Sequence, residues 1–128
     1  MTALVDLQAV VWYVHDDRRL GQNAREALAT GAGELLMSSA SLWELAIKVS
    51  LRKFALDRSI NEYVDRFIKG LHMRIVDVTR SHALRVATLP HLHKDPFDRL
   101  LIAQAMEEGV PIITGDGAIA RYGVEVIW

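Results

Sequence analysis

Four acidic residues lie at positions where a buried carboxylate would lower the stability of the fold, which makes them candidates for a chemical function. Two of them follow apolar runs that are typical of buried strands. Asp6 comes directly after residues 3–5, and Asp116 comes three residues after Ile113. In a parallel sheet both side chains would lie beyond the carboxyl ends of strands, the edge at which open α/β folds bind ligands. Each also has a simpler interpretation, a helix cap for Asp6 and an Asp-Gly turn for Asp116.

Glu44 lies among apolar residues of a predicted helix, between Trp43, Leu45 and Ile47. Its simpler interpretation is an exposed pair with Lys48 at helical i,i+4 spacing. Such a surface pair contributes only about 0.3–0.5 kcal/mol, which does not offset the burial of a carboxylate. The simpler interpretation therefore requires an exposed helix face, and the flanking residues make such a face narrow.

Asp98 also lies in a predicted helix and shares a stripe with Leu101 and Ile102, which should face the core. Its simpler interpretation is a place in the first helical turn, where Asp95 caps the helix and Pro96 is its first residue. We assign Asp95 the cap and keep Asp98 among the candidates for chemistry.

If these four acids converge, their mutual repulsion raises some of their pKa values unless a cation is bound. Hard divalent ions prefer oxygen ligands of this kind, so the predicted cofactor is Mg²⁺ or Mn²⁺. One or two such ions generate a nucleophile from water and stabilise charge on a phosphodiester, which indicates phosphoryl chemistry. Thr114 would add a hydroxyl that orients a carboxylate or a water, or it would satisfy backbone groups at a strand end.

Two cations lie within one helical turn of the proposed catalytic acids, Lys48 near Glu44 and Arg99 beside Asp98. Each is a candidate for phosphate contact, and a salt bridge to the neighbouring acid is an equal alternative. Residues 91–95 contain two histidines and an aspartate, which are permissible zinc ligands. A solvated loop is the better interpretation of this tract, because a short loop without a nearby fourth ligand has poor geometry for zinc.

The elements that must position these residues follow from apolar spacing. Strands are predicted at 3–5, 34–37, 74–78, 110–113 and 125–128, and helices after Asp6 and at 22–28, 39–50, 59–69, 79–88 and 97–107. A turn is expected at 114–117. Strands that alternate with helices predict an α/β sandwich around a mainly parallel sheet of four to five short strands.

Composition narrows the classes of protein and partner. The 128 residues, 51% of them hydrophobic and 24% charged, predict a single globular domain over 1–128. The formal net charge of −1 means that any nucleic-acid binding must be local, and the absence of cysteine excludes disulfides and thiolate metal sites. The first 14 residues resemble neither a signal peptide nor a membrane span, so we expect a cytoplasmic protein with no membrane partner.

The order and spacing of five segments resemble the PIN-domain family, and within it the VapC toxins of bacterial toxin–antitoxin pairs. The segments cover nearly the whole chain: Leu4-Val5-Asp6, residues 41–48 (SLWELAIK), residues 95–105 (DPFDRLLIAQA), Ile113-Thr114-Gly115-Asp116 and residues 120–124 (ARYGV). No segment is decisive by itself, but the combination is specific.

This resemblance implies a three-layer α/β/α fold and a Mg²⁺- or Mn²⁺-dependent endoribonuclease that leaves 5′-phosphate and 3′-hydroxyl ends on its RNA substrate. The family's acidic positions, which are both catalytic and metal-binding, map onto Asp6, Glu44, Asp98 and Asp116, the last either as a ligand or acting through a water.

The resemblance also implies two protein partners, a cognate antitoxin that inhibits the nuclease and a second copy in a homodimer. A hydrophobic groove for the antitoxin would be lined by early-helix residues such as Trp12 and Tyr13. From their surroundings in the sequence, Trp12, Trp43 and Trp128 are interpreted as core or dimer-interface anchors rather than base-stacking platforms.

One departure from the family bears on activity. Many relatives carry a hydroxyl residue after the first aspartate, whereas this chain reads Asp6-Leu7-Gln8, and Leu7 has no hydrogen-bond donor in its side chain. The alternative function is therefore a weak or idle PIN domain that acts only as a binding partner in an antitoxin or regulatory complex. A phospho-acceptor receiver domain is disfavoured, because it needs an early acidic pair and a late lysine where this chain has Asp116.

Overall fold

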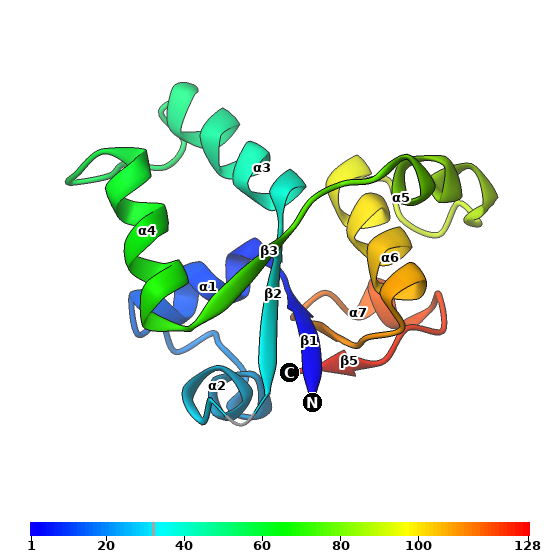
Figure 1. The fold of residues 1–128 in the computed structure, drawn as a ribbon, viewed down its shortest axis with the longest axis horizontal. Coiled ribbons are helices and arrows are strands. Elements are labelled where there is room, and N and C mark those ends of the chain that lie inside the picture. Colours follow the sequence, from blue (N-terminus) through cyan, green and yellow to red (C-terminus); the bar gives the residue numbers. More distant parts are fainter. Residues whose placement is uncertain (32) are drawn as a thin grey trace.

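Five short strands form one parallel sheet in the order β3-β2-β1-β4-β5 (Figure 1). The computed structural model describes residues 1–31 and 33–128. The strands are β1 (Thr2–Val5), β2 (Glu34–Ser38), β3 (Met73–Val76), β4 (Ile112–Ile113) and β5 (Val126–Ile127). The helices are α1 (Leu7–Val14), α2 (Gln22–Ala29), α3 (Ser39–Ser50), α4 (Ile60–Gly70), α5 (Arg80–Arg85), α6 (Pro96–Glu108) and α7 (Gly117–Ala120).

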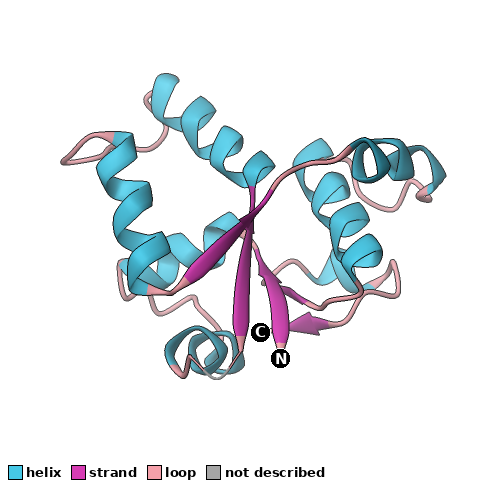
Figure 2. Ribbon diagram, in the orientation of Figure 1, coloured by secondary structure: helices cyan, strands magenta, loops and turns pink. Residues whose placement is uncertain are grey.

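Helices cover both faces of the sheet, which confirms the expected three-layer α/β/α architecture (Figures 1 and 2). Helices α1 to α4 lie on one side and α5 to α7 on the other. Successive strand residues point to opposite faces, so each layer has its own core. Val5 and Met37 pack toward the α1–α4 side, whereas Leu4, Leu36 and Ile112 pack toward α6 and α7.

The strand order places β1 at the centre and makes the chain change direction there. After β1 the chain adds β2 and β3 on one side, then returns to place β4 and β5 on the other side. The backbone N–H of Asp6 donates to the carbonyl of Ile113 (3.0 Å), so the carboxyl ends of β1 and β4 are adjacent. Such a switch point in an open parallel sheet leaves a crevice where ligands bind.

Two predicted elements differ from the structure. The helix expected at 79–88 ends at Arg85 and continues as the 3₁₀ turn Val86–Thr88. The carbonyls of Val86 and Leu89 instead accept hydrogen bonds from the Arg99 guanidinium. The strand expected at 110–113 is only Ile112–Ile113, because Pro111 has no N–H to donate to a sheet.

Among the helices of the described residues, none combines the length and the apolar character needed to cross a membrane.

Candidate active site

Asp6 lies at the end of β1, and its two carboxylate oxygens have different partners. Oδ1 accepts the backbone N–H of Gln8 (3.2 Å) and so caps α1, whereas Oδ2 accepts the hydroxyl of Thr114 (2.8 Å). Thr114 follows β4 and is fully buried, with 0% of its surface exposed. The carboxylate is therefore held across the switch point by a residue from the neighbouring strand.

Asp116 has the same division of tasks. Its Oδ1 accepts the backbone N–H of Ala118 (3.0 Å) and caps α7, while Oδ2 lies 2.6 Å from Nε2 of His93. The backbone N–H of Asp116 donates to the Thr114 hydroxyl oxygen (3.2 Å). Thr114 thus connects Asp6 and Asp116 through a single buried side chain.

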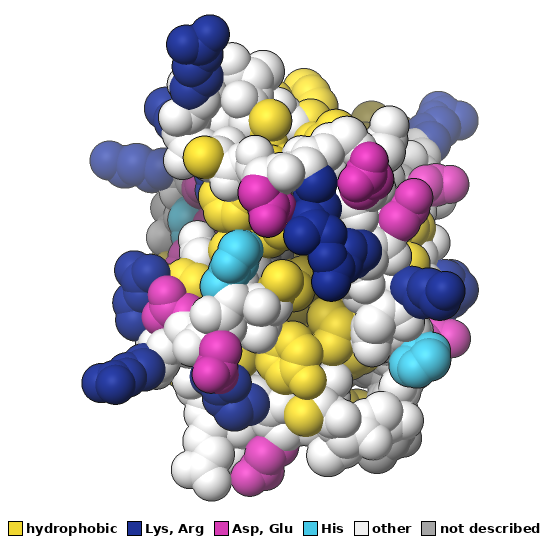
Figure 3. Space-filling model, turned by 90° about the vertical axis from the view of Figure 1, so that its left-hand side faces the viewer, with side chains coloured by type: hydrophobic (Ala, Val, Ile, Leu, Met, Phe, Trp, Pro, Cys, Tyr) yellow, Lys and Arg dark blue, Asp and Glu magenta, His cyan; other side chains and the backbone are white. Residues whose placement is uncertain are grey.

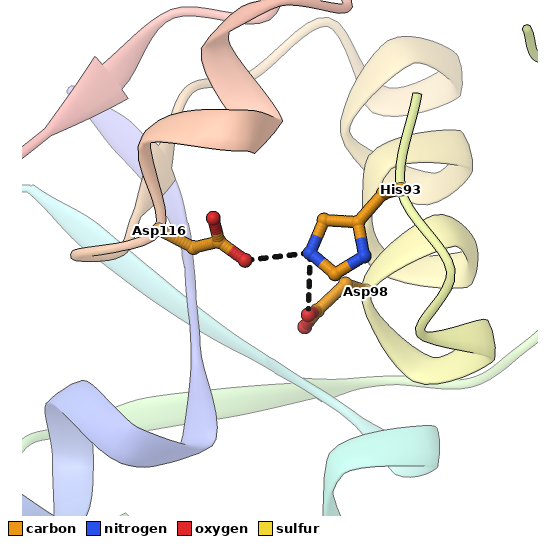
Figure 4. Close-up of side chains that lie close together, drawn as sticks. All are labelled: His93, Asp98 and Asp116. Atoms are coloured by element: carbon orange, nitrogen blue, oxygen red, sulfur yellow. Dashed lines mark hydrogen bonds and ion pairs between the residues drawn. The ribbon is translucent and has the colours of Figure 1, made fainter. Parts of the chain in front are cut away.

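Asp98 reaches the same place from the first turn of α6. Its Oδ2 lies 3.1 Å from Nε2 of His93 (Figure 4). Asp95 caps this helix by accepting the backbone N–H groups of Phe97 (2.8 Å) and Asp98 (3.3 Å), which confirms the predicted cap. Pro96 occupies the first helical position, where its missing N–H costs nothing.

Glu44 faces this centre from α3, which packs against α6 and begins at the Ser38 cap. Its Oε2 lies 3.8 Å from Nζ of Lys48, so the i,i+4 pair exists, but the carboxylate is largely buried. Burial is the largest cause that raises the pKa of Glu44, and the charges of Asp6 and Asp95 raise it further, which places Glu44 within electrostatic range of both.

Burial and mutual repulsion shift the pKa values of these acids. Burial, followed by the charges of Asp95 and Asp6, raises the pKa of Asp98 to about 7. Burial is also the largest cause that raises the pKa values of Asp6 and Glu44. For Asp116 burial acts in the same direction, but the hydrogen bonds from His93 and Ala118 outweigh it and lower the pKa.

His93 is the site residue that sequence reasoning missed. The prediction of a solvated loop is wrong for this residue, since its largely buried imidazole bridges Asp98 and Asp116 (Figure 4). Nδ1 accepts the backbone N–H of Asp95 (3.0 Å), so the ring carries its proton on Nε2, toward the two carboxylates. The hydrogen bond to Asp116 raises the pKa of His93. The available signal was its position two residues before a helix cap.

The donor set fits a divalent cation. Ligand atoms of His93, Asp98 and Asp116 all lie within 4.8 Å of one another. The raised pKa values of Asp6, Glu44 and Asp98 mark carboxylates whose charge is incompletely compensated. The carboxylate oxygens that Asp98 and Asp116 offer here suit Mg²⁺ and Mn²⁺.

The two candidate phosphate contacts have different surroundings. Lys48 keeps 43% of its side chain exposed beside Glu44. Arg99 is a correction, because it is only 7% exposed and its guanidinium donates to the carbonyl of Pro90 (2.8 Å) and the hydroxyl of Tyr122 (3.1 Å), in addition to the bonds to Val86 and Leu89. The guanidinium holds the segment that leads to His93, and these four bonds use the N–H groups of both terminal nitrogens.

Trp43 is not a core residue of this chain, which leaves the dimer interface as the interpretation of its side chain. Its side chain is 63% exposed, and its ring contacts that of Phe97 at a centroid distance of 5.4 Å. Trp12 and Trp128 are partly buried and pack against the core on the α1 side of the sheet, as expected.

The fold and the site together define an α/β protein with an acidic pocket at the switch point of a parallel sheet. The family model for the PIN domain matches residues 3–125. The ribonuclease VapC22 of Mycobacterium tuberculosis (strain ATCC 25618 / H37Rv) is 30% identical over 122 residues, which cover 94% of this chain and 92% of that protein. The chain belongs to the PIN-domain family.

Solved structures share the fold. VapBC2 from Rickettsia felis, bound to a DNA fragment from its promoter, matches with a TM-score of 0.75 and 20% identity, covering 98% of this chain and 97% of that chain. FitAcB from Neisseria gonorrhoeae matches with a TM-score of 0.69 and 17% identity, covering 98% and 96%.

Proposed function

We propose that this protein is a divalent-metal-dependent endoribonuclease that acts as the toxin of a toxin–antitoxin pair. The observation that carries the proposal is the meeting of Asp6, Asp98 and Asp116 at one switch point, with Glu44 in electrostatic range. The likeness to a ribonuclease VapC over 94% of the chain supports the same reaction.

In this proposal Asp6, Glu44 and Asp98 hold Mg²⁺ or Mn²⁺, with Asp116 as a further ligand or acting through water. When bound, the ion supplies the positive charge that activates water and stabilises the phosphodiester during transfer. Thr114 fixes the rotamer of Asp6 by its hydroxyl, which keeps the free lone pairs of Oδ2 on the pocket. Lys48 is placed at the exposed edge, where it contacts a phosphate of the RNA.

His93 has a proton on the atom that faces the acids. Because Nδ1 accepts the backbone N–H of Asp95, this proton belongs to a neutral imidazole, which is too weak an acid to protonate a departing oxygen. We therefore propose that the Nε2–H of His93 positions the carboxylates of Asp98 and Asp116, and that the departing 3′-oxygen takes its proton from water.

The proposal is tested with the purified protein and a structured RNA, in Mn²⁺ or in EDTA. Cleavage is expected in Mn²⁺ alone, and Asp6→Asn and Asp98→Asn should each lower the rate at least roughly 100-fold, because each removes a ligand charge. Asp65→Asn, at an exposed acid on α4, is the matched control and should keep the wild-type rate. Cleavage that survives both EDTA and Asp6→Asn would identify a contaminant and end the enzyme proposal.

The same experiment also tests the alternative function, an idle PIN domain that only binds a partner, which was suggested by Leu7 after the first aspartate. Leu7 is buried in the core, and the hydroxyl that holds Asp6 comes from Thr114 instead. This observation favours catalysis, because the first acid is oriented without a donor at position 7. An idle domain would bind its partner while showing no metal-dependent cleavage.

We propose that the antitoxin binds the hollow between α1 and α4. One solved structure with this fold is a toxin–antitoxin complex from Klebsiella pneumoniae, which matches with a TM-score of 0.60 and 19% identity. The hollow has a volume of about 450 Å³, and its wall includes Tyr13, Tyr63, Phe67 and Leu71, with Arg66 beside them. On this face hydrophobic side chains lie in a depression bordered by basic ones (Figure 3).

Tyr13, one of the two residues expected at the antitoxin groove, lines this hollow, whereas Trp12 does not. The homodimer stays a prediction, for which the exposed apolar side chains of Trp43, Leu51 and Leu84 are candidate contacts. Sedimentation of the purified protein measures it directly.

A further inference from the structure

A second hollow opens beside the acidic centre. It has a volume of about 360 Å³, within the range of small-ligand pockets. Asp6 and Asp116 line one side, and Gln8, Trp12 and Trp128 line the remainder together with Arg19. Two of the four proposed catalytic acids therefore share a wall with two indole rings.

The Trp128 indole packs against the Trp12 ring and against the backbone of two glycines. The ring centroids of Trp12 and Trp128 are 5.8 Å apart, with the planes tilted by 56°. A Cβ at Gly21 would come within 2.7 Å of the Trp128 indole, and a Cβ at Gly115 within 2.8 Å. Only glycine fits at either position, because the backbone lies directly against the ring. The position of the Trp128 ring in the wall is therefore fixed by its packing against residues 21 and 115.

Arg19 adds a positive charge at the rim. Its guanidinium lies 4.6 Å from the centroid of a Trp12 ring, and 69% of its side chain is exposed. Asp17 orients it through bonds from Nε (3.0 Å) and Nη2 (2.8 Å). An aromatic surface with a stacked arginine is the combination that binds bases of single strands, since every base presents a π-face and every nucleotide a phosphate.

We propose that this hollow binds the nucleobase of the RNA nucleotide whose phosphate lies at the acidic centre, an inference that rests on the proposed nuclease function. The wall shared by Asp6, Asp116 and the indoles is what places base and phosphate within one nucleotide of each other. A base in this hollow must leave its own stack, so the substrate is unpaired RNA at the scissile position. Trp12 and Trp128 are then binding residues as well as packing residues.

The experiment compares two small probes, uridine 5′-monophosphate and ribose 5-phosphate, each titrated in saturating Mg²⁺. They differ by the base alone. NMR signals of the three indole N–H groups report binding, and exposed Trp43 is the internal reference. We expect the nucleotide to bind roughly tenfold more tightly than the sugar phosphate and to shift the Trp12 and Trp128 signals selectively.

Trp12→Leu keeps an apolar side chain and removes the indole. We expect Trp12→Leu to weaken the binding of uridine 5′-monophosphate until it lies within roughly twofold of that of ribose 5-phosphate. The affinity for ribose 5-phosphate itself should stay unchanged. If this variant does not fold, Trp128→Leu is measured in the same way. Equal affinities in the wild-type protein, or a preference for the nucleotide that survives the variants, would overturn the base site. Binding of neither probe in a Mg²⁺-dependent manner would instead count against the nuclease itself.

Discussion

At the scale of single residues, Asp6 and Asp116 combine a structural and a chemical task in one side chain. In each, Oδ1 accepts a backbone N–H at the start of a helix, and Oδ2 has a side-chain partner from another segment, Thr114 for Asp6 and His93 for Asp116. An asparagine retains an oxygen for the cap and loses the charge. Asparagine variants therefore separate chemistry from folding at these two positions.

Thr114 holds Asp6 without touching substrate, and its removal should affect the site more than the fold. Thr114→Val preserves the shape of a fully buried residue but deletes the bond to Asp6 Oδ2. We expect the Mn²⁺ affinity or the cleavage rate to fall roughly 10- to 100-fold, as for other partners of metal ligands. Calorimetric titration of Mn²⁺ measures the first effect. Thr114→Ser should restore most of the loss, and failure of this rescue would argue for packing alone.

Asp98 should destabilise the metal-free protein at high pH. Burial raises its folded-state pKa to about 7, above its ordinary value of 3.8. The folded state therefore holds the proton more tightly, and stability is lost as pH rises from about 4 to about 7. In EDTA at pH 8, Asp98→Asn should increase the free energy of unfolding by about 2 kcal/mol after the loss of the His93 contact.

Urea unfolding at pH 8 and pH 4 measures this difference. At pH 4 the gain should vanish, because Asp98 is then protonated in the folded protein. An equal gain at both values would mean that the charge of Asp98 is not its cause.

The residues predictable from the sequence were those whose local surroundings conflict with their charge. Asp6 and Glu44 stood out for this reason. His93 and Arg99 could not be assigned, because their partners are remote: His93 meets Asp116 across 23 positions, and Arg99 meets Tyr122 across 23. Only the fold shows that His93 lies in the candidate site and that Arg99 instead binds the backbone carbonyls of a loop.

At the scale of elements, α6 carries the largest share of site positioning. It begins at the Asp95 cap and ends at Gly109, whose φ of 65° closes the helix in the left-handed region. These boundaries were predictable because cap, proline and glycine act locally. The break between α5 and the 3₁₀ turn was not, since it depends on the Arg99 guanidinium from another helix.

The contribution of the Asp95 cap should be measurable in the free energy of unfolding of the metal-free protein. Asp95→Ala removes the acceptor for two backbone N–H groups and is expected to cost about 1 kcal/mol in the free energy of unfolding. Asp95→Asn keeps an acceptor oxygen and should cost much less. Thermal unfolding of both variants tests this, and an equal loss in the two would assign the effect to charge rather than to the cap.

At the scale of the whole molecule, the parallel sheet was predictable and its order was not. Alternating strands and helices predict parallel pairing, but the central place of β1 depends on pairing with residues 112–113, which no local pattern encodes. The convergence of acids from β1, α3, α6 and the segment before α7 is a property of this order.

Divalent ions should stabilise the entire fold, because they bind groups that are together only in the native state. We expect Mn²⁺ to raise Tm, with the increase growing as pH rises toward 7, since Asp98 must lose its proton to bind the ion. Scanning fluorimetry with and without Mn²⁺ at pH 5.5 and pH 7.5 measures this. Asp98→Asn should show a smaller increase with little pH dependence, and an unchanged increase would exclude Asp98 as a ligand.

The pairing of β1 with β4 has a consequence for the order in which the acidic centre forms during synthesis of the chain. Thr114 and Asp6 are 108 positions apart, so the hydroxyl that holds the first acid emerges from the exit tunnel long after that acid. Until then the central strand lacks a neighbour on one side, and Asp6 has neither its orienting partner nor Asp116 nearby. The acidic centre therefore cannot form on a growing chain before residues 112–116 have been synthesised.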